Sequence, residues 1–336
     1  MFRCLWIKRR KKKEIIHQNL KSDIEDIVDE ESQIDPQFKT KRCYVKISAA
    51  YIRKELIFKK SYEPNDFCRK TVNNLLNRLG YTLKKVLKTK PLKKIPETDA
   101  IFENVHKQHQ LAKANPRILR ISIDAKAKVK VGNLSRKGYS RNKNTPKTDD
   151  HDQHWTDILT PFGMHEVNTD NTFLVFGNSR ETPDFVVDCL EWWWQARQFM
   201  ADQYDLLMID LDNGKSVAGN TKRFLQRIVA FSKKIGLPIQ LVYYPPYHSK
   251  YNMVERFWAA LENYWSSLVL DTVQNTINIA KKVAWKGMNP IVHFLDKEYP
   301  KGVTVNSEDF KELQKFITRN PCLLKWDVQI NHIASG

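Results

Sequence analysis

Apolar residues recur at helical spacing in the first third of the chain. Within residues 64–79 the apolar side chains fall on one face of a helix, so that face would pack on a small core. Gly80 follows the last apolar position and is a typical helix stop. The same spacing predicts an acidic amphipathic helix around residues 24–28 and further helices at residues 47–58 and 98–114.

From residue 117 onward the pattern changes from helical to strand-like. Apolar and charged residues alternate from Ile118, and short apolar runs then alternate with amphipathic segments. The predicted strands cover residues 118–131, 163–167, 172–176, 206–211 and 239–243, and the predicted helices cover residues 182–201, 220–235 and 250–268. The order β-β-β-α-β-α-β-α predicts an α/β fold with a ribonuclease-H-like mixed sheet.

These patterns predict five segments. They are a basic head with an amphipathic helix (1–40), a helix-turn-helix-like domain (41–95), a linker helix (96–116), a ribonuclease-H-like domain (117–285) and a C-terminal extension (286–336).

Positive charge is concentrated in two of these segments. The chain has 56 Lys and Arg against 38 Asp and Glu, a net charge of +18. Residues 41–95 contain 16 basic and three acidic residues, and residues 125–147 contain eight basic residues and no acid. Because neutralised phosphates release counterions, such segments favour a polyanion as partner. A solvated basic surface is the alternative.

The helix at residues 64–79 has a polar face suited to DNA. Residues off its apolar stripe are the predicted DNA contacts: Arg69, Lys70, Asn73 and Asn74. Residues 81–87 alternate like a strand and would form the wing of a winged helix-turn-helix. A helical hairpin with a solvated face is the other interpretation.

Three acidic residues lie at the predicted elements of the sheet. Asp124 lies in the first strand, Asp212 follows the fourth strand, and Glu255 begins the helix after the fifth strand. Carboxylates are the ligands that Mg²⁺ prefers, and two such ions can stabilise both ends of a phosphodiester displacement. Asp210 is the rival for the middle position, because side chains two residues apart on a strand share a face.

Other chemistries are less well supported. The five cysteines form no CxxC pair, which argues against a disulfide framework or a cysteine zinc site and fits a cytoplasmic protein. No apolar stretch reaches the length of a membrane span. His151, Asp152 and His154 are interpreted as surface residues, and Trp192–Trp194 as core residues of a helix, with base stacking as the alternative.

The residues around the three acids resemble a known family. Asp124–Lys128 with Val131–Asn133, Asp212–Gly214 and Pro245–Glu255 are similar to the DDE blocks of Rhodopirellula-type transposases of bacterial insertion sequences. The spacing from the double proline to the glutamate is also similar to that of mariner-type transposases. Two stretches near the end of the chain are similar to the family's closing segment, namely Tyr299–Gly302 and Lys325–Asp327. The resemblance covers residues 25–330.

The resemblance implies metal-dependent cleavage at element ends, followed by strand transfer into target DNA. Asp124, Asp212 and Glu255 would be the catalytic, metal-binding acids, with Mg²⁺, or Mn²⁺ in its place, as two bound ions. Lys126, Lys128 and Lys130 would hold phosphate near the reaction. The expected partner is double-stranded DNA, bound by a homo-oligomer in the cytoplasm of a bacterium or at its nucleoid, without a membrane.

The sequence departs from the family pattern in two places. Members usually begin with an additional helix-turn-helix region that this sequence lacks, and the segment 213–219 has fewer glycines. One alternative is therefore a shortened, catalytically silent DNA-binding protein derived from a transposase. Another is a metal-dependent nuclease without strand transfer.

Overall fold

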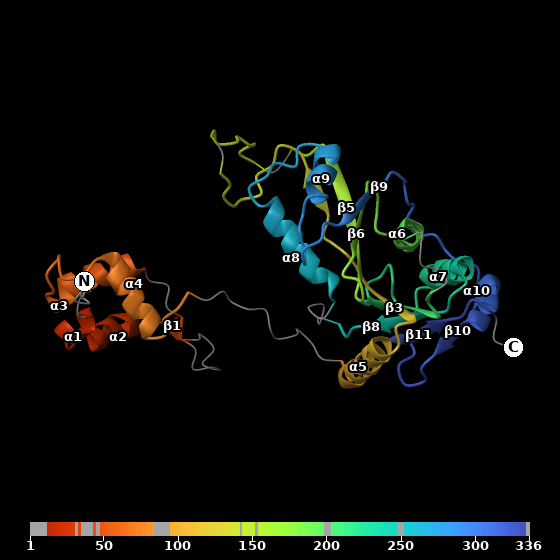
Figure 1. The fold of residues 1–336 in the computed structure, drawn as a ribbon, viewed down its shortest axis with the longest axis horizontal. Coiled ribbons are helices and arrows are strands. Elements are labelled where there is room, and N and C mark those ends of the chain that lie inside the picture. The colour runs from red at the N-terminus through yellow and green to blue at the C-terminus, as the bar shows by residue number, and fades with distance from the viewer. Residues whose placement is uncertain are drawn as a thin grey trace, which may run out of the picture. The chain divides into compact units, whose positions relative to one another are not determined.

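The chain forms two compact units in the computed structural model. Unit 1 covers Met1–Thr89 and unit 2 covers Lys90–Gly336. The structure describes residues 12–30, 33–34, 43–44, 48–83, 95–141, 143–151, 154–197, 203–246 and 252–333. Figure 1 shows the helices and strands of each unit.

Unit 1 is a small helical unit. Its elements are α1 (Lys13–Ile16), α2 (Leu20–Glu30), α3 (Ala49–Lys60), α4 (Arg69–Arg78) and the short strand pair β1 (Gln33–Ile34) and β2 (Cys43–Tyr44). Apolar residues of α2, α3 and α4 form one core, so the acidic amphipathic helix packs with the two helices that follow it. Ser48 caps α3 by accepting a hydrogen bond from the Tyr51 N–H at 3.1 Å.

The third large helix of unit 1 begins five residues later than predicted. Pro64–Asp66 form a turn, closed by a hydrogen bond from the Asp66 N–H to the Glu63 carbonyl at 3.0 Å and by one from the Glu63 N–H to Asp66 Oδ2 at 3.1 Å. This local bonding competes with helix formation, so α4 begins only at Arg69. Of the predicted wing, residues 84–87 lie outside the described residues.

Unit 2 is built on a mixed sheet. Its strands are β3 (Ile118–Ala125), β4 (Val129–Val131), β5 (Asp157–Glu166), β6 (Thr172–Gly177), β7 (Leu206–Leu211), β8 (Ile239–Tyr243), β9 (Ile291–Leu295), β10 (Ile317–Arg319) and β11 (Asp327–Ile330). They lie in the order β10-β11-β8-β7-β3-β5-β6-β9, with β4 paired to β5 outside this path. β3 is antiparallel to β5 and parallel to β7, which is in turn parallel to β8. The predicted ribonuclease-H-like mixed sheet is confirmed.

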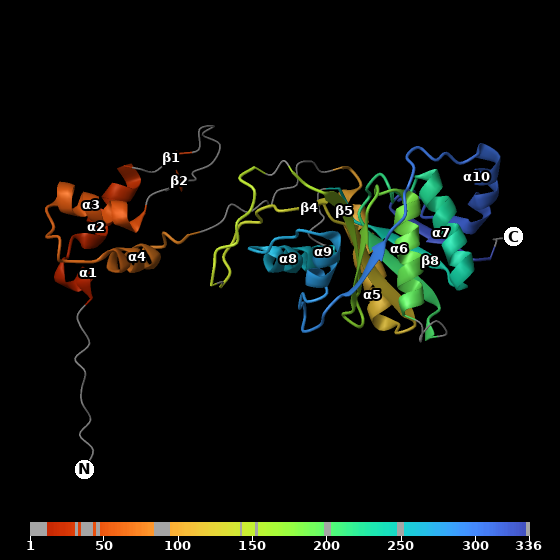
Figure 2. The same ribbon diagram turned by 90° about the horizontal axis from the view of Figure 1, so that it is seen from above.

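Helices cover both faces of this sheet. They are α5 (Thr98–Ala114), α6 (Pro183–Ala196), α7 (Lys222–Ile235), α8 (Val254–Trp265), α9 (Val273–Ala280) and α10 (Ser307–Leu313), followed by the 3₁₀ turn η3 (Gln314–Phe316). Ser122 and Asp210 are register partners on β3 and β7 and point to the same face. Because Ser122 bonds to residues at the start of α8 and Asp210 to a residue of α5, these two helices cover that face. The opposite face carries α6 and α7, which lie side by side (Figure 2).

The residues after 285 extend the sheet at both edges. β9 pairs in parallel with β6 at one edge, and β11 pairs with β8 at the other. This segment, which the sequence pattern separated from the catalytic domain as an extension, is thus part of the same sheet. The helices α6 and α8 are shorter than predicted, and the residues flanking them at 198–202 and 247–251 lie outside the described part of the chain.

Candidate active site

Asp124 lies near the carboxyl end of the central strand β3. Its Oδ2 accepts a hydrogen bond from Trp258 Nε1 of α8 at 2.9 Å. Burial raises the pKa of Asp124 to about 7, and the hydrogen bond from Trp258 acts against this increase. The negative charges of three further carboxylates, Asp212, Glu255 and Glu181, add to it. These acids therefore share one region of negative potential.

Asp212 follows the last residue of the neighbouring strand β7. The register of β3 and β7 pairs Ser122 with Asp210, so Asp124 and Asp212 lie at the same level where the two strands end. Asp212 is exposed, and its Oδ1 accepts a hydrogen bond from the Gly214 N–H at 3.1 Å. The turn at Asp212–Gly214 is thus closed by the candidate ligand itself.

Asp210 is engaged elsewhere. It is fully buried, and its carboxylate forms an ion pair with Arg120 at 2.6 Å. His109 Nε2 of α5 lies 3.0 Å from Oδ1, and the Tyr244 hydroxyl donates to Oδ2 at 3.3 Å. These contacts bind Asp210 into the interface between the sheet and α5, whereas Asp212 faces a cleft.

Glu255 is placed by the anchored start of α8. Asn252 is buried and donates from Nδ2 to the Ile123 carbonyl at 2.8 Å. Ser122 Oγ donates to Asn252 Oδ1 and accepts from the Val254 N–H at 3.0 Å. These bonds hold the first turn of α8 against β3, next to Asp124. Glu255 lies in that turn, where the helix dipole favours a negative charge.

A cleft of about 710 Å³ opens beside two of the predicted acids. Asp124, Asp212 and Glu181 line it, together with Lys215 and Lys301. In the described part of the chain, no group of three or more His, Cys, Asp or Glu side chains is arranged so that it could hold a metal ion. The oxygen donors nevertheless suit Mg²⁺ or Mn²⁺, because these ions prefer carboxylate ligands. The neighbouring carboxylates raise the pKa of Asp124, and a bound cation would offset this repulsion.

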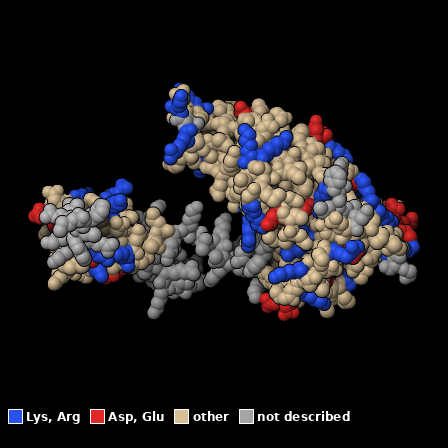
Figure 3. Space-filling model, in the orientation of Figure 1, with Lys and Arg blue, Asp and Glu red and all other residues tan. Residues whose placement is uncertain are grey.

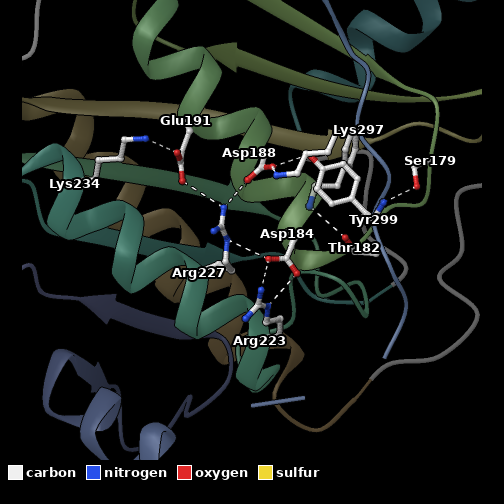
Figure 4. A network of polar contacts seen from close by, with 11 residues as sticks. Ser179, Thr182, Asp184, Asp188, Glu191, Arg223, Arg227, Lys234, Lys297 and Tyr299 are labelled. Carbon is white, nitrogen blue, oxygen red and sulfur yellow. Dashed lines mark hydrogen bonds and ion pairs between the residues drawn. The ribbon is translucent and has the colours of Figure 1, made fainter. Parts of the chain in front are cut away.

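One wall of the cleft is fixed by a network of ion pairs between α6 and α7 (Figure 4). Asp184 accepts two hydrogen bonds from Arg223, at 3.0 and 2.7 Å, and both residues line the cleft. Asp188 binds Arg227 at 2.5 Å and the Tyr299 hydroxyl at 2.7 Å. Because Pro300–Val303 also line the cleft, this network connects the C-terminal segment to the candidate site.

The predicted DNA-contacting residues of α4 share one exposed face. Arg69, Lys70, Asn73 and Asn74 are all exposed, whereas the apolar residues between them face the core of unit 1. This arrangement agrees with the sequence pattern. Whether the face contacts DNA stays a prediction.

The three predicted phosphate-binding lysines lie in different surroundings. Lys126 is mostly buried and forms an ion pair with Glu262 of α8 at 2.6 Å. Lys130 Nζ lies 3.8 Å above the Trp155 ring, and Lys128 is exposed. Figure 3 shows further Lys and Arg side chains on the loop between β4 and β5, where exposed basic residues are Lys137, Arg141, Lys143 and Lys147.

The remaining candidates behave as structural or surface residues. His151 is exposed and lies 3.8 Å from Asp150, and His154 is also exposed; Asp152 lies outside the described residues. Trp193 is fully buried and donates to Glu166 Oε1 at 3.0 Å. Trp192 stacks on His293 with ring centroids 4.8 Å apart. The core interpretation of this helix is confirmed at Trp193.

Sequence reasoning missed several residues that shape the site. Trp258 lies three residues after Glu255, a spacing that places both on one side of a helix and could have drawn attention to it. Ser122 lies two residues before Asp124 on the same strand face. Glu181 reaches the site through a loop conformation for which the sequence pattern has no comparable signal.

Residues 23–332 match the family described as the Rhodopirellula transposase DDE domain. No curated protein matches the chain. Among solved structures, the mariner Mos1 paired-end complex with Mg has 12% identity, covers 82% of each chain and gives a TM-score of 0.41. The Mos1 mariner paired-end complex with Mn has 11% identity, with 71% of this chain and 72% of that chain covered, and a TM-score of 0.41.

Proposed function

Because the chain belongs to the family of Rhodopirellula-type DDE transposases, we propose that it cuts DNA at the ends of its own insertion sequence and joins the freed 3′ ends to target DNA. The observation that carries this proposal is the position of Asp124 and Asp212 at the ends of adjacent strands, with Glu255 in the electrostatic field of Asp124. These are the acids that the family resemblance assigns to catalysis.

The three carboxylates would form the catalytic centre. Asp124 and Asp212 would hold two divalent cations between them, and Glu255 would complete the binding site of the second cation. When bound, Mg²⁺ or Mn²⁺ would activate the attacking water or 3′ hydroxyl and neutralise charge that develops on the phosphate. Contacts within the chain hold these three acids in place. Asp210 connects β7 to α5, and Asn252 connects the start of α8 to β3.

DNA would be held by basic residues in both units. The exposed α4 face with Arg69, Lys70, Asn73 and Asn74 would bind the element end in the major groove. In unit 2, Lys128 is exposed, and Lys126 would exchange Glu262 for a phosphate near the cleft. Because both ends of an element must be cut and joined together, we expect the active form to be a homo-oligomer on DNA.

Cleavage of a duplex that carries the element end is the direct test. The full-length chain is incubated with Mg²⁺ or Mn²⁺, and nicked and joined products are resolved on a denaturing gel. We expect Asp124→Asn to lower the cleavage rate by at least about a hundredfold, because it removes a charged ligand of the cations. EDTA should abolish the products of the parent chain.

The possible outcomes separate the competing functions. Equal cleavage by Asp124→Asn would contradict the assignment of the site. DNA binding by the parent chain without any cleavage would indicate a protein that acts by occupancy. Cleavage without joining of 3′ ends to target DNA would indicate a nuclease.

In the described residues, no helix has both the length and the apolar character needed to cross a membrane. The proposed function requires none, since its substrate is DNA.

A further inference from the structure

A tryptophan of α8 holds the carboxylate of Asp124. Trp258 Nε1 donates to Asp124 Oδ2 at 2.9 Å, and only 8% of the Trp258 surface is exposed. The indole packs against Phe257, with ring centroids 5.5 Å apart, so its position is fixed by the core between α8 and the sheet. Asp124 also lines the cleft. The carboxylate is therefore held from the helix side while it remains accessible from the cleft.

The strand next to Asp124 is shaped to admit this indole. Gly163 of β5 is the register partner of Asp124. A Cβ atom at Gly163 would lie 2.7 Å from two atoms of the Trp258 ring and 2.9 Å from Val254 Cγ2. Such distances are far below van der Waals contact, so a side chain at this position would displace the indole. The lack of a side chain at Gly163 thus leaves room for the Trp258 indole, which donates its hydrogen bond to Asp124 of β3.

The same helix carries both Glu255 and the donor to Asp124. The two residues are three positions apart and lie one above the other on α8. We propose that Trp258 is a positioning residue of the DDE site, whose indole N–H fixes the orientation in which the Asp124 carboxylate meets a divalent cation. This inference rests on the proposed function, because it assumes that Asp124 binds a cation. Hydrogen bonds to ligating carboxylates typically contribute ten- to a hundredfold to metal affinity or activity.

A second tryptophan on the same helix provides a matched control. Trp265 is fully buried in the same core, and its Nε1 has no hydrogen-bond partner in the part of the chain that the structure describes. Trp258→Phe and Trp265→Phe therefore remove the same volume from the same helix. Only Trp258→Phe removes a donor to a carboxylate.

Mn²⁺ binding to the full chain without DNA tests the proposal. Free Mn²⁺ is followed by its electron paramagnetic resonance signal, and urea unfolding shows that each variant is folded. We expect Trp258→Phe to weaken Mn²⁺ binding about tenfold and Trp265→Phe to change it by less than about twofold. Equal binding by the parent chain and Trp258→Phe, or equal losses in both variants, would overturn the positioning role.

The metal-free protein gives an independent spectroscopic readout. The chain has nine tryptophans, and Trp258→Phe identifies the indole N–H resonance of Trp258 by its loss. At a pH well above 7, where the Asp124 carboxylate is charged, Asp124→Asn replaces a charged acceptor with a neutral one, so this resonance should shift more than the other indole resonances. If it does not shift, the hydrogen bond is absent in solution and the proposal is wrong.

A second pair of variants tests the geometry if Trp258→Phe does not fold. Gly163→Ala should displace the indole and weaken Mn²⁺ binding. Gly177→Ala is the control, because its Cβ would lie 2.6 Å from the Phe185 ring, an equally close aromatic contact on the opposite face. A loss of binding confined to Gly163→Ala supports the proposal, and equal binding by both variants contradicts it. Absence of Mn²⁺ binding in the parent chain would overturn the proposed function, and the positioning role with it.

Discussion

At the scale of single residues, environment separates two aspartates that the sequence leaves equivalent. Asp210 is fully buried against Arg120, His109 and Tyr244, whereas Asp212 is exposed at the cleft. Periodicity places both on one strand face, but it does not show that Arg120 of β3 and His109 of α5 contact only one of them. The sequence therefore narrowed the choice to two acids, and the packing of α5 distinguished them.

This difference predicts opposite effects of two similar substitutions. Asp210→Asn leaves Arg120 buried beside a neutral group, so it should lower the free energy of unfolding by about 3 kcal/mol. Asp212→Asn should change the free energy of unfolding by less than about 0.5 kcal/mol, because the residue is exposed. It should nevertheless abolish DNA cleavage.

Urea unfolding and the cleavage assay measure the two effects on the same preparations. If Asp210→Asn were stable and inactive while Asp212→Asn remained active, the second catalytic acid would be Asp210.

At the scale of elements, the anchoring of α8 to β3 decides where Glu255 lies. The pattern of the sequence predicts a strand, a turn and a helix, but it specifies neither the angle nor the depth at which the helix docks. Three hydrogen bonds among Ser122, Ile123, Asn252 and Val254 fix both. These bonds join residues about 130 positions apart. The periodicity of apolar residues is a local property, so it does not predict contacts between such distant residues.

Loss of the serine hydroxyl should therefore affect both stability and the site. Ser122→Ala leaves the Val254 N–H and Asn252 Oδ1 without their partner, so we expect a loss of about 1–3 kcal/mol in the free energy of unfolding. Because the first turn of α8 is then less firmly held, Mn²⁺ binding should also weaken.

A buried serine elsewhere serves as the control. Ser232 is also fully buried, and it donates to the Leu237 carbonyl at 2.6 Å near the end of α7. Ser232→Ala should lower stability without changing Mn²⁺ affinity. A similar loss of Mn²⁺ affinity in both variants would show that the effect comes from general destabilisation.

At the scale of the whole molecule, the two units have different predicted tasks. Unit 1 presents the exposed polar face of α4, and unit 2 contains the acids of the cleft. Because the units have separate cores, DNA affinity and cation binding should be separable by substitution.

Substitutions on α4 should weaken DNA binding in a salt-dependent manner. If Arg69 and Lys70 each contact a phosphate, replacing both with Ala should reduce the slope of log affinity against log salt by about two. Mn²⁺ binding by unit 2 should not change. Fluorescence anisotropy with a labelled end duplex at several salt concentrations measures the slope.

The control removes the same charge from another helix of unit 1. Lys59 and Lys60 of α3 bond to Glu30 at 2.8 Å and to Asp26 at 2.7 Å, so their replacement with Ala should leave the slope nearly unchanged. An equal change for both pairs would point to net charge rather than to the face of α4.

The order of elements and the candidate acids follow from the sequence alone, with Asp210 left as a rival to Asp212. Apolar periodicity is a local property, and it encodes the alternation of strands and helices that leads to the mixed sheet. Asp124, Asp212 and Glu255 could be named as candidates because each lies at a recognisable point of that order. Contacts between distant residues were decided only by the tertiary structure. These include the burial of Asp210, the bond from Trp258 to Asp124 and the addition of β9 and β11 to the sheet edges. The physical reason is that such contacts depend on how side chains fill the space between elements, and sequence spacing does not specify that space.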